Sequence, residues 1–242
     1  MTPTYVYGLV HAGATVPGGL CGLEASGVRT VVHDQLAALV SDVPSGRALG
    51  TRNDLLAHER VVNTMVATTA VLPMRFPGLA EGDSIVDELL VPNHDRLLAM
   101  LEELDGRVQF TVKGRYEQDV VLREVISDRP EILELRDRVQ ELPEDAGYYD
   151  RIRLGELVVG ELEARRDEES VVLHDRLGGG AVAAVARPPS APEEVLNSAF
   201  LIERDHQDTF EAAVEALGAE LAGRVRLRMI GPVAAYDFVP EE

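Results

Sequence analysis

The stretch from residue 117 to residue 177 constrains the fold of this chain more than any other feature. It carries two apolar stripes at helical spacing, the first made of Ile132, Leu135, Val139 and Leu142 and the second of Leu154, Leu157, Val158 and Leu162. Residues 143–147 supply a turn between the stripes. Two helices joined by a short turn bury such stripes by packing against each other in opposite directions. The pattern therefore predicts an antiparallel helical hairpin.

Strand-like runs flank this hairpin on both sides. Residues 107–116 alternate polar and apolar side chains through Lys113, which predicts a half-buried strand. Beyond Gly178 to Gly180 the patterns predict strands at 181–186 and 195–202, a helix from Asp205 or Asp208 to about Ala222 with Phe210, Val214 and Leu217 on its buried side, and a strand at 224–230. The order from residue 107 is thus β-α-β-β-α-β, which is the ferredoxin-like arrangement with its first crossover expanded into the helical hairpin.

The residues before this region predict a second, smaller domain. Strands are expected at residues 5–10, 28–33 and 36–40, arranged as an antiparallel meander, and helices are expected at 52–69 and from Asp83 or Ser84 towards Leu104. The fold class is therefore α+β with two domains. Residues 1–104 form a small N-terminal α/β domain with the β-meander and helices, and residues 105–242 form a modified ferredoxin-like domain with the helical insertion at about 117–177.

The charge of the chain argues against nucleic acid as a partner. The 242 residues carry 42 acidic and 23 basic side chains, for a formal net charge of −19. Nucleic acids are held mainly by Lys and Arg contacts to phosphates, and no basic stripe stands out against this excess of acid. Residues 116–176 contain 18 of the acidic side chains and 9 arginines, so the hairpin supplies about half of the net negative charge. We expect these charges to lie on its solvent faces.

The chain is expected to reside in the cytoplasm and not in a membrane. Its single cysteine, Cys21, cannot form an internal disulfide, which fits a reducing compartment. The N-terminus lacks the basic and apolar regions of a signal peptide, and no uncharged apolar stretch is long enough to span a bilayer.

Standard catalytic and cofactor motifs are absent, so we predict no catalytic, cofactor-binding or metal-binding residues and no cofactor. His58-Glu59 begins like a zinc protease motif, but the second histidine four residues later is missing. The chain also has neither a P-loop nor a G-x-S-x-G elbow. His58 shares the predicted helix face of Leu55, Val62, Met65 and Thr69, where a histidine is more often a satisfied core residue than a functional one.

Some polar residues fit neither core packing nor simple solvation. Arg75 lies between Met74 and Phe76 in an apolar run, where it either pairs with a buried carboxylate or faces a partner. Asn197 interrupts an apolar strand, which favours a role at an edge or in stabilising a turn. Arg224, Arg226 and Arg228 alternate along the last strand and share one face, where they either pair with carboxylates or hold an anionic ligand.

Several short motifs, in this order and spacing, resemble the gas vesicle protein F/L family. They are Tyr5-Val-Tyr-Gly-Leu-Val, Leu39-Val-Ser-Asp-Val-Pro44, His58-Glu59 followed by Val71-Leu-Pro-Met-Arg-Phe76, Val195-Leu-Asn-Ser-Ala-Phe-Leu-Ile202 with the later Phe210, and Gly231-Pro-x-x-x-Tyr-x-Phe238. The resemblance runs nearly from end to end. One departure is Val233-Ala-Ala235, where the family often has another proline before the aromatic residue.

The resemblance implies a cytoplasmic, gas vesicle-associated accessory protein of gas vesicle formation that is not an enzyme. It also implies a two-domain α+β architecture whose C-terminal part is a modified ferredoxin-like fold. The implied partners are the small, hydrophobic gas vesicle shell protein and other gas vesicle accessory proteins.

Within this frame we predict the partner contact at Leu72, Pro73, Met74, Arg75 and Phe76, termed the 72–76 segment below. Pro73 restricts the run to a strand start or a sheet edge, and Arg75 is not explained by packing. The alternative function is a ferredoxin-like module that binds or senses a small ligand, because such modules serve many purposes.

Overall fold

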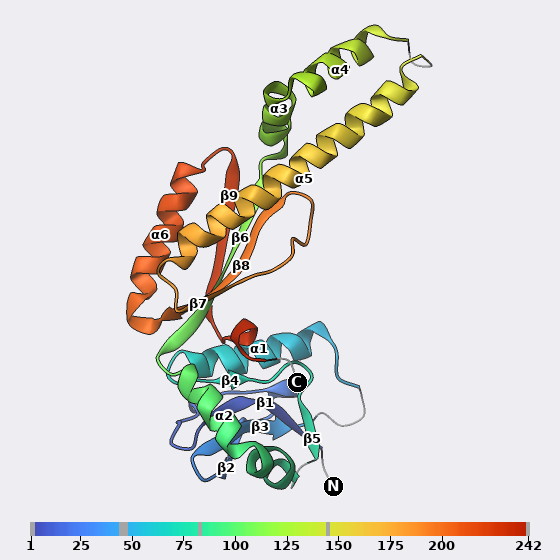
Figure 1. Cartoon of the computed structure of the whole chain (residues 1–242). Coiled ribbons are helices and arrows are strands. Elements are labelled where there is room, and N and C mark those ends of the chain that lie inside the picture. The colour runs from blue at the N-terminus through green and yellow to red at the C-terminus, as the bar shows by residue number, and fades with distance from the viewer. Residues whose placement is uncertain (1–2, 44–47, 82–83, 144–145, 241–242) are drawn as a thin grey trace. The chain divides into compact units, whose positions relative to one another are not determined.

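The computed structural model describes residues 3–43, 48–81, 84–143 and 146–240 and is shown in Figure 1. Helices are combined with two antiparallel sheets. The chain divides into two compact units, and neither is continuous in sequence. The first unit comprises residues 1–110, 201–205 and 231–242, and the second comprises residues 111–200 and 206–230.

The sheet of the first unit is built around its first strand. Its strands are β1 (Pro3–His11), β2 (Arg29–His33), β3 (Leu36–Asp42), β4 (Leu72–Pro73) and β5 (Leu79–Glu81). The order is β2-β3-β1-β4, and β5 also pairs with β1. The predicted meander is therefore wrong, because β1 pairs with β3 and not with β2. The nearly continuous apolar run of β1 is typical of a central strand that is buried on both faces.

Two helices cover the opposite faces of this sheet. Tyr5 and Tyr7 of β1 contact His58 in helix α1 (Arg52–Val66). Val6 belongs instead to an apolar cluster that includes Leu97 and Leu101 of helix α2 (Val91–Glu103). Because neighbouring side chains of a strand point to opposite faces, α1 and α2 lie on different sides of the sheet.

The start of α1 differs from the predicted apolar face. Thr51 and Asp54 form a capping box, in which the Asp54 carboxylate accepts hydrogen bonds from the backbone N–H groups of Gly50 and Thr51. Asp54 is consequently buried, whereas Leu55 is exposed. The prediction for His58, Val62 and Met65 is confirmed, because all three are buried.

A short π-helical segment, Ile85–Leu90, leads directly into α2. Ser84 precedes it without a side-chain capping hydrogen bond, and the other predicted cap, Asp83, lies outside the described residues. Pro92 occupies the first turn of α2, where its missing N–H costs nothing. Pro44, the last residue of one family motif, also lies outside the described residues.

The second sheet has the order β7-β8-β6-β9. Its strands are β6 (Arg107–Tyr116), β7 (Ala183–Ala186), β8 (Glu194–Glu203) and β9 (Val225–Val233). β6 lies between two neighbours, and the prediction of a half-buried strand is wrong, because Gln109 and Thr111 are buried as well. Gly231, the first residue of the last family motif, belongs to β9, and a Cβ atom there would lie 2.7 Å from the Phe110 ring. This close approach explains the glycine.

The predicted helical hairpin is present, but its first arm consists of two helices. They are α3 (Gln118–Asp128) and α4 (Pro130–Glu141), and the second arm is the long helix α5 (Tyr148–Gly178), which lies beside both (Figure 1). The first arm breaks at Arg129 because a residue that precedes proline disfavours helical backbone angles.

Helix α6 (Gln207–Glu220) packs on the same side of the second sheet as α5. Phe210 of α6 and His174 of α5 both contact the Phe200 ring of β8. The predicted buried side of α6 is confirmed, since Phe210, Val214 and Leu217 are all buried. Among the described residues, no helix combines the length and the apolar composition that crossing a membrane requires.

Candidate functional site

The 72–76 segment is an edge strand followed by a turn. Its first two residues form β4, which pairs with β1 at the end of the strand order, as Pro73 predicts. Leu72 and Pro73 are buried, whereas Met74 and Phe76 are half-buried and Arg75 is exposed. The accessible part of the segment is therefore the Arg75 side chain between two apolar neighbours.

Phe76 lies beside a cluster of rings that the sequence did not predict as a unit. The cluster consists of Tyr5, Tyr7, His58, Phe76 and Tyr236. His58 Nδ1 is 2.9 Å from the Tyr5 hydroxyl, and His58 Nε2 is 2.9 Å from the Tyr236 hydroxyl. A neutral imidazole has one donor and one acceptor, and a phenol can fill either role, so both ring nitrogens are satisfied.

Burial keeps this cluster uncharged. It lowers the pKa of His58 to about 4, and it raises the pKa of Tyr5, Tyr7 and Tyr236 above the usual tyrosine value. The imidazole and the phenols are therefore neutral at physiological pH. They form a hydrogen-bonded network that connects β1, α1 and the segment around Tyr236, all within the first unit. This confirms the interpretation of His58 as a satisfied core residue.

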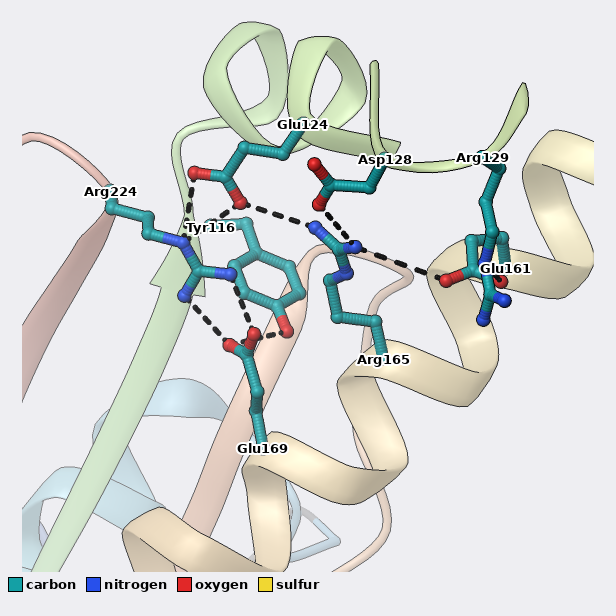
Figure 2. Close-up of polar contacts among 8 residues, drawn as sticks. All are labelled: Tyr116, Glu124, Asp128, Arg129, Glu161, Arg165, Glu169 and Arg224. Carbon is teal, nitrogen blue, oxygen red and sulfur yellow. Dashed lines mark hydrogen bonds and ion pairs between the residues drawn. The ribbon is translucent and has the colours of Figure 1, made fainter. Parts of the chain in front are cut away.

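The second unit contains an ionic network that joins the two arms of the hairpin to the sheet (Figure 2). The Arg224 guanidinium donates to both carboxylate oxygens of Glu124 at 3.0 Å and to those of Glu169 at 2.8 and 2.6 Å. The Tyr116 hydroxyl donates to Glu169 at 3.0 Å. Arg165 on α5 extends the network to Glu124 at 3.3 Å.

The same network continues along the hairpin. Arg165 also donates to Asp128 at 2.9 Å, and Arg129 pairs with Glu161 at 2.8 Å (Figure 2). These bonds connect the end of α3, and Arg129 directly after it, to α5. The network therefore fixes the position of α3 against α5, in addition to the apolar contacts between the arms.

The protonation states of Glu169, Arg224 and Tyr116 favour these ion pairs and hydrogen bonds. Burial raises the pKa of the Glu169 carboxyl, but hydrogen bonds from Arg224 and Tyr116 lower it by more, so its pKa lies below the usual value. The hydrogen bond to Glu169 raises the pKa of Arg224 in turn, and burial raises the pKa of Tyr116. The ion pairs stay charged and Tyr116 stays a donor at physiological pH.

The three arginines of the last strand have different surroundings. Arg224 belongs to the ionic network, and Arg226 donates to Glu117 at 2.6 Å. Pairing with carboxylates is thus confirmed for these two. Arg228 lines an open hollow of about 1070 Å³ together with four further basic residues, Lys113, Arg115, Arg123 and Arg226, and with Glu117, Asp119 and Glu193. Basic side chains outnumber acidic ones here, against the trend of the whole chain.

An apolar groove of about 640 Å³ lies between the hairpin and the loop that joins β7 to β8. Its walls include Val121 and Leu122 of α3, Val159 and Leu162 of α5, and Pro189 and Pro192 of the loop. Tyr116 contributes to the same groove. All these residues belong to the second unit.

The remaining candidate residues have local roles. Asn197 donates from its side chain to the Pro188 carbonyl at 3.3 Å, so it holds the start of the loop that joins β7 to β8. Cys21 is half-buried, and its thiol donates to the Gly19 carbonyl at 3.3 Å. In the described part of the chain, no three His, Cys, Asp or Glu side chains are grouped so that they could hold a metal ion.

Sequence reasoning missed the ionic network and the groove because their residues are far apart in the chain. Within the network, Arg224 is 100 positions from Glu124 and 55 positions from Glu169. The alternation of Arg224, Arg226 and Arg228 did not single out the network, because only Arg224 bonds carboxylates on α3 and α5.

Similarity to known proteins extends over nearly the whole chain. The sequence profile of the family described as "Gas vesicle synthesis protein GvpL/GvpF" matches residues 3–240. "Gas vesicle protein F" of Streptomyces sp. (strain CB03234) is 35% identical over 98% of this chain and 99% of its own length. "Gas vesicle protein L" of the same strain is 29% identical over 97% of this chain and 91% of its own length.

The fold also matches a solved structure. The crystal structure of the gas vesicle protein GvpF from Anabaena sp. PCC7120 superposes with a TM-score of 0.85 and covers 100% of both chains. The sequence identity is 24%, so this likeness concerns the fold.

Proposed function

The chain belongs to the gas vesicle synthesis protein GvpL/GvpF family and has a role in gas vesicle formation, and on this premise we propose that it is a non-enzymatic accessory protein. In this role it binds the hydrophobic shell protein and other accessory proteins in the cytoplasm. The observation that carries the proposal is the family match over residues 3–240, which includes both compact units.

The charge of the chain supports this role. A shell protein exposes apolar surface before it is incorporated into the vesicle wall, and a soluble partner can cover that surface. A net charge of −19 keeps such a complex in solution and complements basic residues on the shell protein.

The contact with the shell protein is assigned to the 72–76 segment. Arg75 is exposed at the edge of the first sheet, between the half-buried side chains of Met74 and Phe76. An exposed guanidinium flanked by apolar surface is a common composition for the centre of a protein interface.

Co-purification of the shell protein with the full-length chain tests this assignment. We expect Arg75→Glu to reduce the recovered shell protein about tenfold, because a reversed charge at a contact is strongly unfavourable. Arg52→Glu, which changes an exposed arginine elsewhere in the first unit, is the matched control and should leave recovery unchanged. If the unmodified chain retains no shell protein, the proposed function is wrong. If both variants behave alike, only the assigned segment is wrong.

The second sheet is proposed to be a modified ferredoxin-like fold, as the order of its elements suggests. Its strands follow the chain order β6, β7, β8, β9, with the hairpin after β6 and α6 after β8. The spatial order β7-β8-β6-β9 supports the proposal, because the first and third strands of the motif are the central pair. The same proposal places the domain boundary along the chain between residues 104 and 105, with residues 201–205 and 231–242 returning to the first unit.

A small-ligand module is the second candidate function, and the basic hollow at Arg228 favours it. Five basic side chains lining one hollow of an acidic chain could hold an anionic metabolite. Thermal-shift titrations with anionic metabolites separate the two functions, since a specific ligand raises the melting temperature in proportion to the logarithm of its concentration. Arg228→Glu would abolish that rise.

A further inference from the structure

The apolar groove between α3, α5 and the β7–β8 loop has the shape and charge of a docking site. From these features we infer that it binds a basic amphipathic helix of a protein partner. The apolar face of that helix enters the groove, and its lysine or arginine side chains contact the acidic rim.

The groove is open and lined by aliphatic side chains. Val159 is 54% exposed and Leu122 is 38% exposed, although both are large hydrophobic residues. Val121 and Tyr116, which also line the groove, are buried in contrast. An open trough of this kind suits an extended apolar ridge, such as one face of a helix, better than an enclosed small molecule.

The charged side chains that line the groove determine which kind of helix can bind there. The lining includes three carboxylates, on Asp119, Glu163 and Glu193, and one guanidinium, on Arg166. Arg166 is itself paired with Asp167 at 3.0 Å. Glu193 is likewise paired with Arg115 at 3.7 Å. With these two pairs counted as neutral, Asp119 and Glu163 leave the lining net negative, on a chain with a net charge of −19. A helix flanked by basic residues is favoured there, and an acidic helix is repelled.

The walls of the groove are held in place before any partner arrives. The ionic network of Arg224, Arg165, Glu124 and Glu169 ties α3 to α5, and Tyr116 belongs both to this network and to the groove. On the third side, Ser190 donates from its backbone N–H and its hydroxyl to Glu194, at 2.6 and 2.9 Å. A preformed groove binds with a smaller entropic cost.

This surface goes beyond the proposed contact with the shell protein. The 72–76 segment belongs to the first unit, whereas every residue of the groove belongs to the second. The inference stands on the composition of the groove and does not require the shell protein to be its occupant.

Titration of the full-length chain with two synthetic peptides tests the inference. One is an amphipathic helix of leucine and lysine with a single tryptophan, and the other has glutamate in place of every lysine. The chain has no tryptophan, so the peptide fluorescence reports binding directly. We expect the lysine peptide to bind and the glutamate peptide not to bind.

The variants Val159→Lys and Val171→Lys separate the groove from general attraction to an acidic surface. Both valines lie on α5 and are similarly exposed, at 54% and 60%, but only Val159 lines the groove. We expect Val159→Lys to raise the Kd for the lysine peptide about tenfold or more and Val171→Lys to change it less than about twofold. Leu122→Lys, on the opposite wall, should repeat the effect of Val159→Lys.

Three results would overturn the inference. The first is the absence of binding by the unmodified chain, and the second is equal binding of the two peptides. The third is an equal effect of Val159→Lys and Val171→Lys, because attraction by the overall charge would then explain the binding. None of these results bears on the co-purification of the shell protein.

Discussion

At the scale of single residues, His58 shows how burial decides the role of a titratable group. The sequence places it on an apolar helix face and leaves open whether it is functional. In the structure both of its ring nitrogens are bonded to tyrosine hydroxyls, and burial lowers its pKa to about 4. Its neutral form stabilises the first unit, and its charged form would destabilise it.

This environment predicts a dependence of stability on pH. The unfolded chain binds a proton at His58 near pH 6.5, whereas the folded chain binds it only near pH 4. Stability is therefore complete above pH 6.5 and is lost as the pH falls towards 4, by about 3 kcal/mol from this residue. His58→Gln keeps a donor and an acceptor but does not titrate. The free energy of unfolding, measured with urea between pH 4 and 6.5, should depend less on pH in the variant than in the unmodified chain. An equal dependence on pH in both proteins would contradict the prediction.

At the scale of elements, the sequence predicted the helices and strands better than their partners. Heptad spacing indicated the hairpin, and the break at Pro130 follows from local backbone sterics. The meander was wrong because the pairing of β1 with β3 depends on which strands become central. The burial of β6 on both faces has the same origin, since alternation alone cannot show what covers the polar face.

The ionic network predicts unequal effects for two arginines of the second unit. Arg224→Met leaves the half-buried Glu169 and Glu124 without their main partner, and we expect it to lower the free energy of unfolding by about 1–3 kcal/mol. Arg176→Met removes a bidentate pair with Glu220 that is exposed, and it should have little effect. Chemical denaturation of both variants checks this. Equal losses would show that the network does not hold α3 to α5.

At the scale of the whole molecule, the first unit is assembled from three stretches of the chain. Leu201 and Ala235 belong to its apolar cluster, and Phe238 packs against it. Arg204 donates to the Val66 carbonyl at the end of α1 at 2.7 Å. Residues beyond position 200 therefore complete an apolar cluster whose first member along the chain is Val6.

A fragment of residues 1–104 tests how far the first unit depends on these later stretches. The fragment lacks Leu201, Arg204 and Tyr236, and with them part of its core and one hydrogen bond of His58. We expect it to unfold without a cooperative thermal transition when followed by circular dichroism. A cooperative transition at the temperature of the full chain would instead support independent folding up to the predicted boundary at residue 104.

The sequence by itself determined the family, the helical hairpin, the order of elements after residue 107 and the excess of acid. These properties are encoded in short-range spacing and in composition, which a linear chain displays directly. Only the tertiary structure decided that β1 is central, that Arg224 bonds carboxylates on two helices, and that α3, α5 and a distant loop form an open groove. Each of these depends on contacts between residues that are tens of positions apart, and 100 positions apart for Arg224 and Glu124. Such contacts form only where the free energy gained by burial exceeds the entropic cost of bringing the segments together. A local sequence pattern does not reveal which of the two is larger.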